Sequence, residues 1–221
     1  LDRLAHARRP SVWQWLLHNY LFFRVPLLRP QRLLARITPW LGWLHSRGFV
    51  IASAMTALAG LYLLARQWDV FTHSVAAQFD PAGLLCFAIA LLLAKSLHEF
   101  SHAIAATREG VRVAHMGVAF LVMWPMLYTD TSESWKLRDP KARFRIAAAG
   151  MLAEFLLAAW ATLGWSLADD GPVRDALLFL ATTSWLLTLG INASPFMRFD
   201  GYFLLSDALD LPNLHARAGE L

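Results

Sequence analysis

The sequence is poor in cysteine and in charge. Its 221 residues contain a single cysteine, Cys86, so a disulfide framework and a thiolate zinc cluster are excluded, because both need several cysteines at set spacings. Charged residues make up only 16% of the chain and hydrophobic residues 57%, against roughly 25% and 45–50% in ordinary soluble domains. This composition excludes disordered, collagen-like and coiled-coil chains. It indicates a membrane protein in which any metal is held by His, Asp or Glu.

The basic residues are not arranged for nucleic acid. The formal net charge is +4, and a nucleic-acid binder would gather its Lys and Arg on one face. Here they flank apolar segments instead, so we expect no nucleic-acid partner.

Four apolar segments approach or exceed the ~20 helical residues that cross a lipid bilayer: residues 49–65, 82–106, 146–168 and 176–195. In the stretches between them, seventeen Lys and Arg fall on one side of the membrane and two on the other. The positive-inside rule therefore places the N-terminus, the 107–145 loop and the C-terminus in the cytoplasm. The predicted fold class is an all-α polytopic membrane protein with about four transmembrane helices.

The chain divides into three predicted regions. Residues 1–48 combine Trp, Phe and Arg with several prolines, and we expect an interfacial region of short amphipathic helices on the cytoplasmic surface. Residues 49–210 form the core. Within it, Val111–Tyr128 is apolar and rich in β-branched and aromatic residues, which predicts a short β-hairpin or a re-entrant segment. Residues 211–221 are interpreted as the truncated start of a following region.

The second predicted span ends in a metal-binding pattern. Its residues 97–102 read Leu-His-Glu-Phe-Ser-His, so His98 and His102 stand four residues apart on one helix face. Two such imidazoles can bind one zinc ion, and Glu99 beside them can act as general base on a water molecule. Because ionisable groups inside a membrane are costly and need a partner, we favour a bound metal over the alternative of interior histidines hydrogen-bonded to neighbouring helices.

A catalytic zinc usually has three protein ligands, and Asp200 is the best candidate for the third. It follows the fourth span and lies on the same predicted side of the membrane as His98 and His102. Pro195 ends the helix and Gly201 permits a tight turn, so the chain can fold back toward the two histidines.

Two motifs together resemble the site-2 protease family of intramembrane zinc metalloproteases: His98-Glu99-x-x-His102 in one span, and Asn192-x-x-Pro195 with Asp200-Gly201 after a later one. The resemblance covers about residues 82–210. It implies one zinc ion per chain, held by His98, His102 and Asp200. It also implies Glu99 as general base and Asn192 as a group that holds the substrate or the oxyanion.

The segment Arg198–Tyr202 and the pattern Pro125-x-x-Tyr128-x-Asp130 are similar to a bacterial branch of the family. That branch is often found beside or fused to adaptor subunits of membrane export systems. The resemblance therefore implies an integral protein of a bacterial inner membrane, with its active site toward the cytoplasm and an export adaptor as a partner.

Two positions differ from the family pattern. Met197 stands where a second proline is frequent, and Glu154 stands where the third span commonly has an asparagine. Glu154 could accept a hydrogen bond from a ligand histidine or pair with Lys95 on the neighbouring span. Lys95 in turn could lower the pKa of Glu99, four residues on, or merely pair. Asp130, three residues before Glu133, is expected to cap a helix.

The predicted function is hydrolysis of a peptide bond in or near a membrane-spanning segment of a protein or peptide substrate. An exposed strand edge in Val111–Tyr128 could hold the substrate in extended form. The alternative is a non-catalytic scaffold subunit of an export or adaptor complex that retains the metal site. A di-iron oxygenase needs more clustered histidines, and a transporter would show broken spans in matching halves.

Overall fold

The computed structural model describes residues 22–121, 124–195 and 199–209. The N-terminal part of this region comprises β1 (Phe22–Leu28), α2 (Gln31–Ile37), a 3-10 helix (Thr38–His45), α3 (Arg47–Arg66) and α4 (Trp68–Ala77). The central part comprises α5 (Pro81–Arg108), β2 (Met116–Leu121), β3 (Trp124–Thr129) and a second 3-10 helix (Ser132–Lys136). The last part comprises α6 (Pro140–Leu167), α7 (Pro172–Trp185), the π-helix η3 (Leu186–Asn192) and α8 (Asp200–Ala208). The expectations for residues 1–21, Met197 and residues 211–221 fall outside the described residues.

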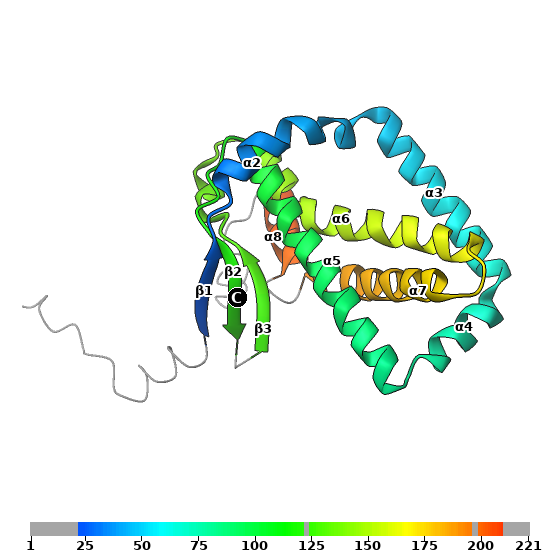
Figure 1. Ribbon diagram of the computed structural model, residues 1–221. Helices are drawn as coiled ribbons and strands as arrows, with labels where there is room; N and C mark the ends of the chain where they lie inside the picture. Colours follow the sequence, from blue (N-terminus) through cyan, green and yellow to red (C-terminus); the bar gives the residue numbers. More distant parts are fainter. Residues whose placement is uncertain (1–21, 122–123, 196–198, 210–221) are drawn as a thin grey trace, which may run out of the picture.

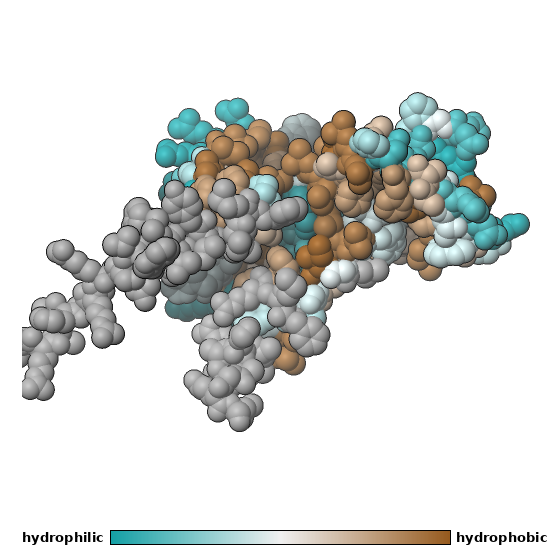
Figure 2. All heavy atoms as spheres, turned by 90° about the horizontal axis from the view of Figure 1, so that it is seen from below, coloured by the Kyte–Doolittle hydropathy of each residue, from teal (hydrophilic) through white to brown (hydrophobic). Residues whose placement is uncertain are grey.

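Four helices in the described residues are long and apolar enough to cross a membrane: α3, α5, α6, and α7 continued by η3 to Asn192. The mostly helical, polytopic fold expected from composition is thereby confirmed. The outward faces of α3 and α5 expose large apolar side chains such as Ile51, Leu58, Leu85 and Leu92. In Figure 2, apolar surface covers much of the middle of one face and hydrophilic residues gather toward its ends. A lipid environment explains this distribution.

Local sequence sets where these helices begin. Asp80 and Asp139 precede α5 and α6, and each is followed by a proline at the first helical position. Asp80 Oδ1 accepts a hydrogen bond from Gly83 N, and Asp139 Oδ1 accepts one from Lys141 N. Such caps satisfy backbone N–H groups that have no partner within the helix. The start of α5 in turn fixes where its histidines lie along the span.

Helix α6 lies at the centre of the bundle and packs against α3, α5 and α7 (Figure 1). Its buried residues are mostly small, including Gly150, Ala158, Ala159 and Ala161. Small residues let helix backbones approach closely in a membrane, where no hydrophobic effect drives the helices together. This close approach brings α6 against the histidine-bearing face of α5.

A three-stranded antiparallel sheet of order β1-β2-β3 lies beside α5. The expected β-hairpin is present as β2 and β3. The expectation of surface helices is wrong for Phe22–Leu28, which forms strand β1 and pairs with β2. The physical reason is that this aromatic and β-branched segment satisfies its backbone by extending the hairpin, whereas Gln31–His45 is helical as expected. Thr129 Oγ1 donates to the carbonyl of Glu99, which ties β3 to the α5 turn that carries the metal-binding pattern.

Candidate metal centre

Three side chains from two parts of the chain converge at the inner face of α5. The Nε2 atoms of His98 and His102, one helical turn apart, lie 3.1 Å from each other. Asp200, the first residue of α8, brings its Oδ2 to 2.9 Å from His98 Nε2 and 3.2 Å from His102 Nε2. The three residues whose spacing suggested a metal site are therefore brought together.

This donor set fits a zinc ion. Ligand atoms 2.0–2.1 Å from a tetrahedral zinc lie about 3.3 Å from one another, close to the separations seen here. His102 Nδ1 lies 2.7 Å from the carbonyl oxygen of Ile146 and must carry the proton that this oxygen accepts. Its Nε2 is then free to bind a metal. His98 Nδ1 lies 2.9 Å from Glu154 Oε1, which directs His98 Nε2 toward the same point.

Gly150 of α6 makes the room for both imidazoles. A Cβ at this position would lie 2.5 Å from His102 Nε2 and 2.6 Å from His98 Nε2. Atoms cannot approach so closely without displacing one another, so a side chain here would push both rings away from the centre. The absence of a side chain at position 150 is thus part of the site.

The environment of Asp200 favours its charged form. Burial by itself would raise the pKa of this carboxyl, but hydrogen bonds with His102 and His98 hold the pKa well below its usual range. A carboxylate that remains ionised can serve as a metal ligand.

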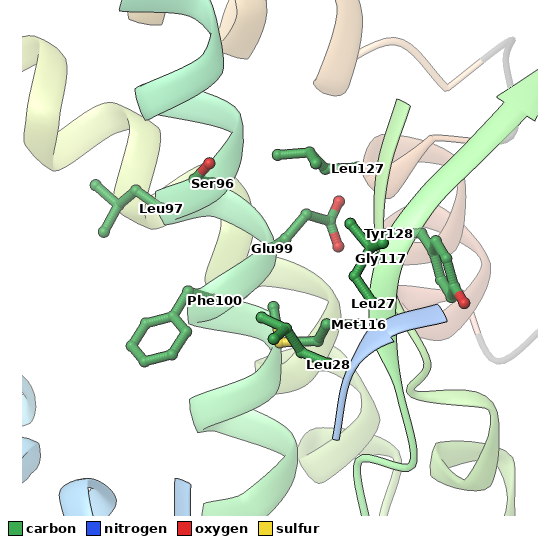
Figure 3. Close-up of a pocket in the computed structure, with 10 residues that line it drawn as sticks. All are labelled: Leu27, Leu28, Ser96, Leu97, Glu99, Phe100, Met116, Gly117, Leu127 and Tyr128. Carbon is green, nitrogen blue, oxygen red and sulfur yellow. The ribbon is translucent and has the colours of Figure 1, made fainter. Parts of the chain in front are cut away.

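Glu99 faces two cavities beside the histidines. A polar cavity of about 870 Å³ is lined by Glu99, His102 and Asp200 together with residues of β3 and α8. An apolar cavity of about 470 Å³ adjoins it between α5 and the sheet, and Glu99 lines this one too. Figure 3 shows the Glu99 carboxylate pointing from α5 toward the strands, near Leu127 and Tyr128. Among the described residues, its carboxylate has no hydrogen-bond or ion-pair partner and is free to meet a ligand.

Comparison with known proteins agrees with this geometry. Residues 86–168 match the family model described as Peptidase family M50. This match supports assignment to the M50 family, the site-2 protease family. The family expected from the two motifs is confirmed, and it supports a membrane metalloprotease.

One relative and one negative finding complete the comparison. Over 70 residues, 31% of this chain, the sequence is 37% identical to "Uncharacterized protein MJ0971" of Methanocaldococcus jannaschii. The match covers 19% of that protein's length, so the chain spans about a fifth of this relative. No solved structure matches the chain.

Behind the ligands lies a buried polar cluster. Glu154 of α6 is completely buried and lies against Lys95, His98, Thr188 and Asn192. The expected pairing of Glu154 with Lys95 is present, and the same oxygen also lies 2.9 Å from Nδ1 of the ligand histidine His98. Lys95 pairs with Glu154 and Asn192, and no hydrogen bond or ion pair joins Lys95 to the Glu99 side chain among the described residues.

Asn192, expected to hold the substrate or the oxyanion, is only 3% exposed. Its amide nitrogen donates to Glu154 Oε2, and its oxygen accepts from Lys95 Nζ. Both ends of the amide are thus occupied within the protein in this structure. Its role toward substrate stays a prediction.

Asp130 lines the polar cavity at the end of β3. Its Oδ1 accepts hydrogen bonds from the backbone N–H and the hydroxyl of Ser132, the first residue of a 3-10 helix whose N-cap is Thr131 rather than the expected Asp130. The hydroxyl bond is the main reason that the pKa of Asp130 lies below its usual range.

Sequence reasoning gave no role to Gly150, to the carbonyl of Ile146 or to Thr188. Ile146, Gly150 and Glu154 follow one another at four-residue intervals on α6 and so share one face. That spacing, combined with small or polar residues inside an apolar span, is the feature of the sequence that could have indicated a face packed against the metal centre. Which helix this face meets becomes evident only from the packing of α6 on α5.

Proposed function

We propose that this chain is a zinc-dependent membrane endopeptidase that hydrolyses a peptide bond in or near a membrane-spanning segment of a protein or peptide substrate. One observation supports this most strongly. His98 Nε2, His102 Nε2 and Asp200 Oδ2 converge within 4.8 Å of one another, and Glu99 lines the cavity onto which His102 and Asp200 open. A purely structural metal site would need no unpartnered carboxylate beside it.

A zinc ion held by His98, His102 and Asp200 would polarise the carbonyl of the scissile bond and make a water molecule more acidic. Glu99 supplies the proton transfers. Its carboxylate takes a proton from the attacking water and delivers it to the leaving nitrogen. Because no described residue holds this carboxylate, it can turn between these two positions.

The two cavities suit an apolar, extended substrate segment. The apolar cavity has leucine, methionine and aromatic side chains on its wall, and the polar cavity continues from it past Glu99 to Asp200. Strand β3 ends the sheet on the side that contacts α5. We propose that a substrate segment pairs with the outer edge of β3, which would expose its peptide bonds to the site.

The distribution of charge supports a cytoplasmic location for the site. Arg108, which ends α5, lies ten residues beyond His98, about 15 Å along the helix, and the basic 107–145 stretch follows it. We place this side of the protein in the cytoplasm. The bacterial inner membrane and an export-adaptor partner belong to the same proposal and rest on the motif resemblance.

Metal content and cleavage measured together test the proposal. Purified wild type should contain one zinc per chain, and His98→Ala should contain none. Glu99→Gln should retain zinc and should cleave at least ~100-fold more slowly a membrane-protein substrate that wild type cuts, because general base catalysis contributes that much or more. Leu93→Ala, at an exposed position one turn earlier on α5 and outside both cavities, is the matched control and should leave zinc content unchanged.

The outcomes separate the two functions. Absence of zinc from a folded wild type would refute the metalloprotease. Zinc retention with full biological activity of Glu99→Gln would favour the scaffold subunit instead.

A further inference from the structure

Glu154 is a completely buried carboxylate in the middle of a membrane-spanning helix, and hydrogen-bond donors surround it. Its Oε1 lies 3.0 Å from Lys95 Nζ and 2.9 Å from His98 Nδ1. Its Oε2 accepts from Thr188 Oγ1 at 3.1 Å and from Asn192 Nδ2 at 2.5 Å. Each oxygen therefore has two polar neighbours at 3.1 Å or less.

This arrangement requires a carboxylate. An ionised Glu accepts at both oxygens, whereas the amide of Gln accepts at one end and donates at the other. In either orientation of its amide, a Gln at position 154 would direct its NH₂ group at two of the donors that now surround the carboxylate. The negative charge also needs compensation in the membrane, and Lys95 Nζ provides it.

The two oxygens of Glu154 contact two different parts of the metal centre. Oε1 lies against Nδ1 of His98, the ligand from α5. Oε2 holds Thr188 and Asn192, which belong to the π-helix η3 at the end of the fourth span. π-Helical turns are rare and occur frequently at functional sites.

The end of η3 also lies against the residue next to the third ligand. A Cβ on Gly201 would come within 2.6 Å of the carbonyl oxygen of Ala193 and 2.8 Å of that of Asn192. The backbone that follows η3 is therefore in close contact with the start of α8, where Asp200 lies. A displacement of η3 would be transmitted to Asp200.

We propose that Glu154, with its charge balanced by Lys95, is the positioning residue of the metal centre. It fixes the ring of His98 directly and the location of Asp200 through η3, so one carboxylate sets the relative placement of ligands from α5 and α8. The proposal rests on the metal site proposed above. In this proposal Lys95 balances the charge of Glu154 and does not tune the general base Glu99.

The test measures zinc affinity and thermal stability on the full chain in detergent. Zinc affinity is obtained by competition with a chromophoric chelator. Glu154→Gln should bind zinc 10–100-fold more weakly, the usual effect of removing a partner of a ligand histidine. Lys95→Met should lower the unfolding temperature, because it leaves Glu154 buried without its cation.

The double variant Glu154→Gln with Lys95→Met separates positioning from folding. It removes both charges, so the unfolding temperature should return toward that of wild type while zinc affinity stays 10–100-fold weaker. If the pair served only to stabilise the fold, both quantities would recover together, and that result would overturn the proposal.

A matched control breaks a different contact between the same helices. Trp185 Nε1 of α7 donates to Thr162 Oγ1, eight residues beyond Glu154 on α6. Trp185→Phe should leave zinc affinity within about twofold of wild type. An equal loss in Trp185→Phe and Glu154→Gln would show that general loosening of α6 and α7 is the cause, and would overturn the positioning role.

Two further results keep the inference separate from the proposed function. If wild type itself binds no zinc, the proposed function fails. If wild type binds zinc and Glu154→Gln binds it equally well, only the positioning role fails. If neither Glu154 variant folds, Thr188→Val provides the test, because it keeps the charges of Glu154 and Lys95 and removes one hydrogen-bond donor to Oε2. Weaker zinc binding by this variant would support the proposal, and unchanged zinc binding would overturn it.

Discussion

Substitution of Gly150 by alanine is the most direct probe of how the metal centre is built. The change adds one methyl group and touches no proposed ligand residue. That methyl carbon would lie 2.5 Å from His102 Nε2 and 2.6 Å from His98 Cε1 and Nε2. Ordinary contacts with such atoms are about 3.5–4.0 Å, so each ring must move by roughly 1 Å or α6 must separate from α5 by a similar distance.

Either movement should destroy the metal geometry more than the fold. A displacement of ~1 Å is large against the ±0.2 Å tolerance of zinc–ligand distances. We expect zinc affinity to fall by at least ~100-fold, which corresponds to about 2.8 kcal/mol. The cost to folding is smaller, because overpacking costs roughly 1–3 kcal/mol and alanine regains about 1 kcal/mol over glycine in a helix interior.

Chelator competition on detergent-purified protein measures the zinc affinity, and thermal unfolding measures the stability. Gly164→Ala is the matched control on the same helix. The nearest atoms to a Cβ there belong to the Leu177 side chain, at 3.1 Å or more, and that flexible group can move aside. Wild-type zinc affinity in Gly150→Ala would refute the close approach of α6 to the ligand rings, and an equal loss in both variants would refute its specificity.

Three other predictions probe the surroundings of the site. Asp207→Asn removes the partly buried ion pair between Arg143 of α6 and Asp207 of α8. Such pairs contribute about 1 kcal/mol, so we expect zinc affinity to fall about fivefold. Unchanged zinc affinity would show that other contacts hold α8 in place. In a Cys86→Ser background, an impermeant maleimide should label Ser132→Cys from the cytoplasmic side and His73→Cys from the opposite side; the reverse pattern would invert the proposed topology. Single proline substitutions along residues 126–128 test strand pairing. Where a proline removes an outward-facing N–H of β3, cleavage of a full substrate should fall while zinc affinity stays intact. An equal loss of cleavage and zinc affinity would argue against strand pairing.

The spans could be predicted from the sequence because each is a long apolar run bounded by charge, and the structure places helices over all four. Their exact ends depended on local caps: Pro81 and Pro140 begin α5 and α6 earlier than hydropathy alone suggests. Strand β1 could not be predicted, since Phe22–Leu28 is amphipathic in composition and acquires its extended form by pairing with β2, whose partner residues lie 88 to 99 positions later.

The candidate site was predictable to a different depth for each residue. His98, Glu99 and His102 form a local pattern whose meaning follows from helical geometry, and Asp200 follows a helix-ending proline with a glycine after it. Glu154 stood out as an ionisable residue in a span, but its neighbours could not be chosen from sequence. Its contacts join residues between thirty-four and fifty-nine positions away, and such distances are set by tertiary packing.

The packing of α5 on α6 explains why the ligand helix alone does not make the site. Along α5, residues at four-residue intervals form one row: Ala94, His98, His102 and Ala106, with both alanines fully buried. A matching row on α6 faces them, formed by Ile146, Gly150, Glu154 and Ala158. Each member of the α6 row near the histidines has its own effect, since Ile146 offers a carbonyl to one ring, Glu154 offers a carboxylate to the other, and Gly150 between them offers space. None of these three residues binds the metal itself. The orientation of both imidazoles is nevertheless fixed from α6. Substitutions in this row of α6 should therefore alter zinc affinity as strongly as substitutions of α5 residues that surround the histidines.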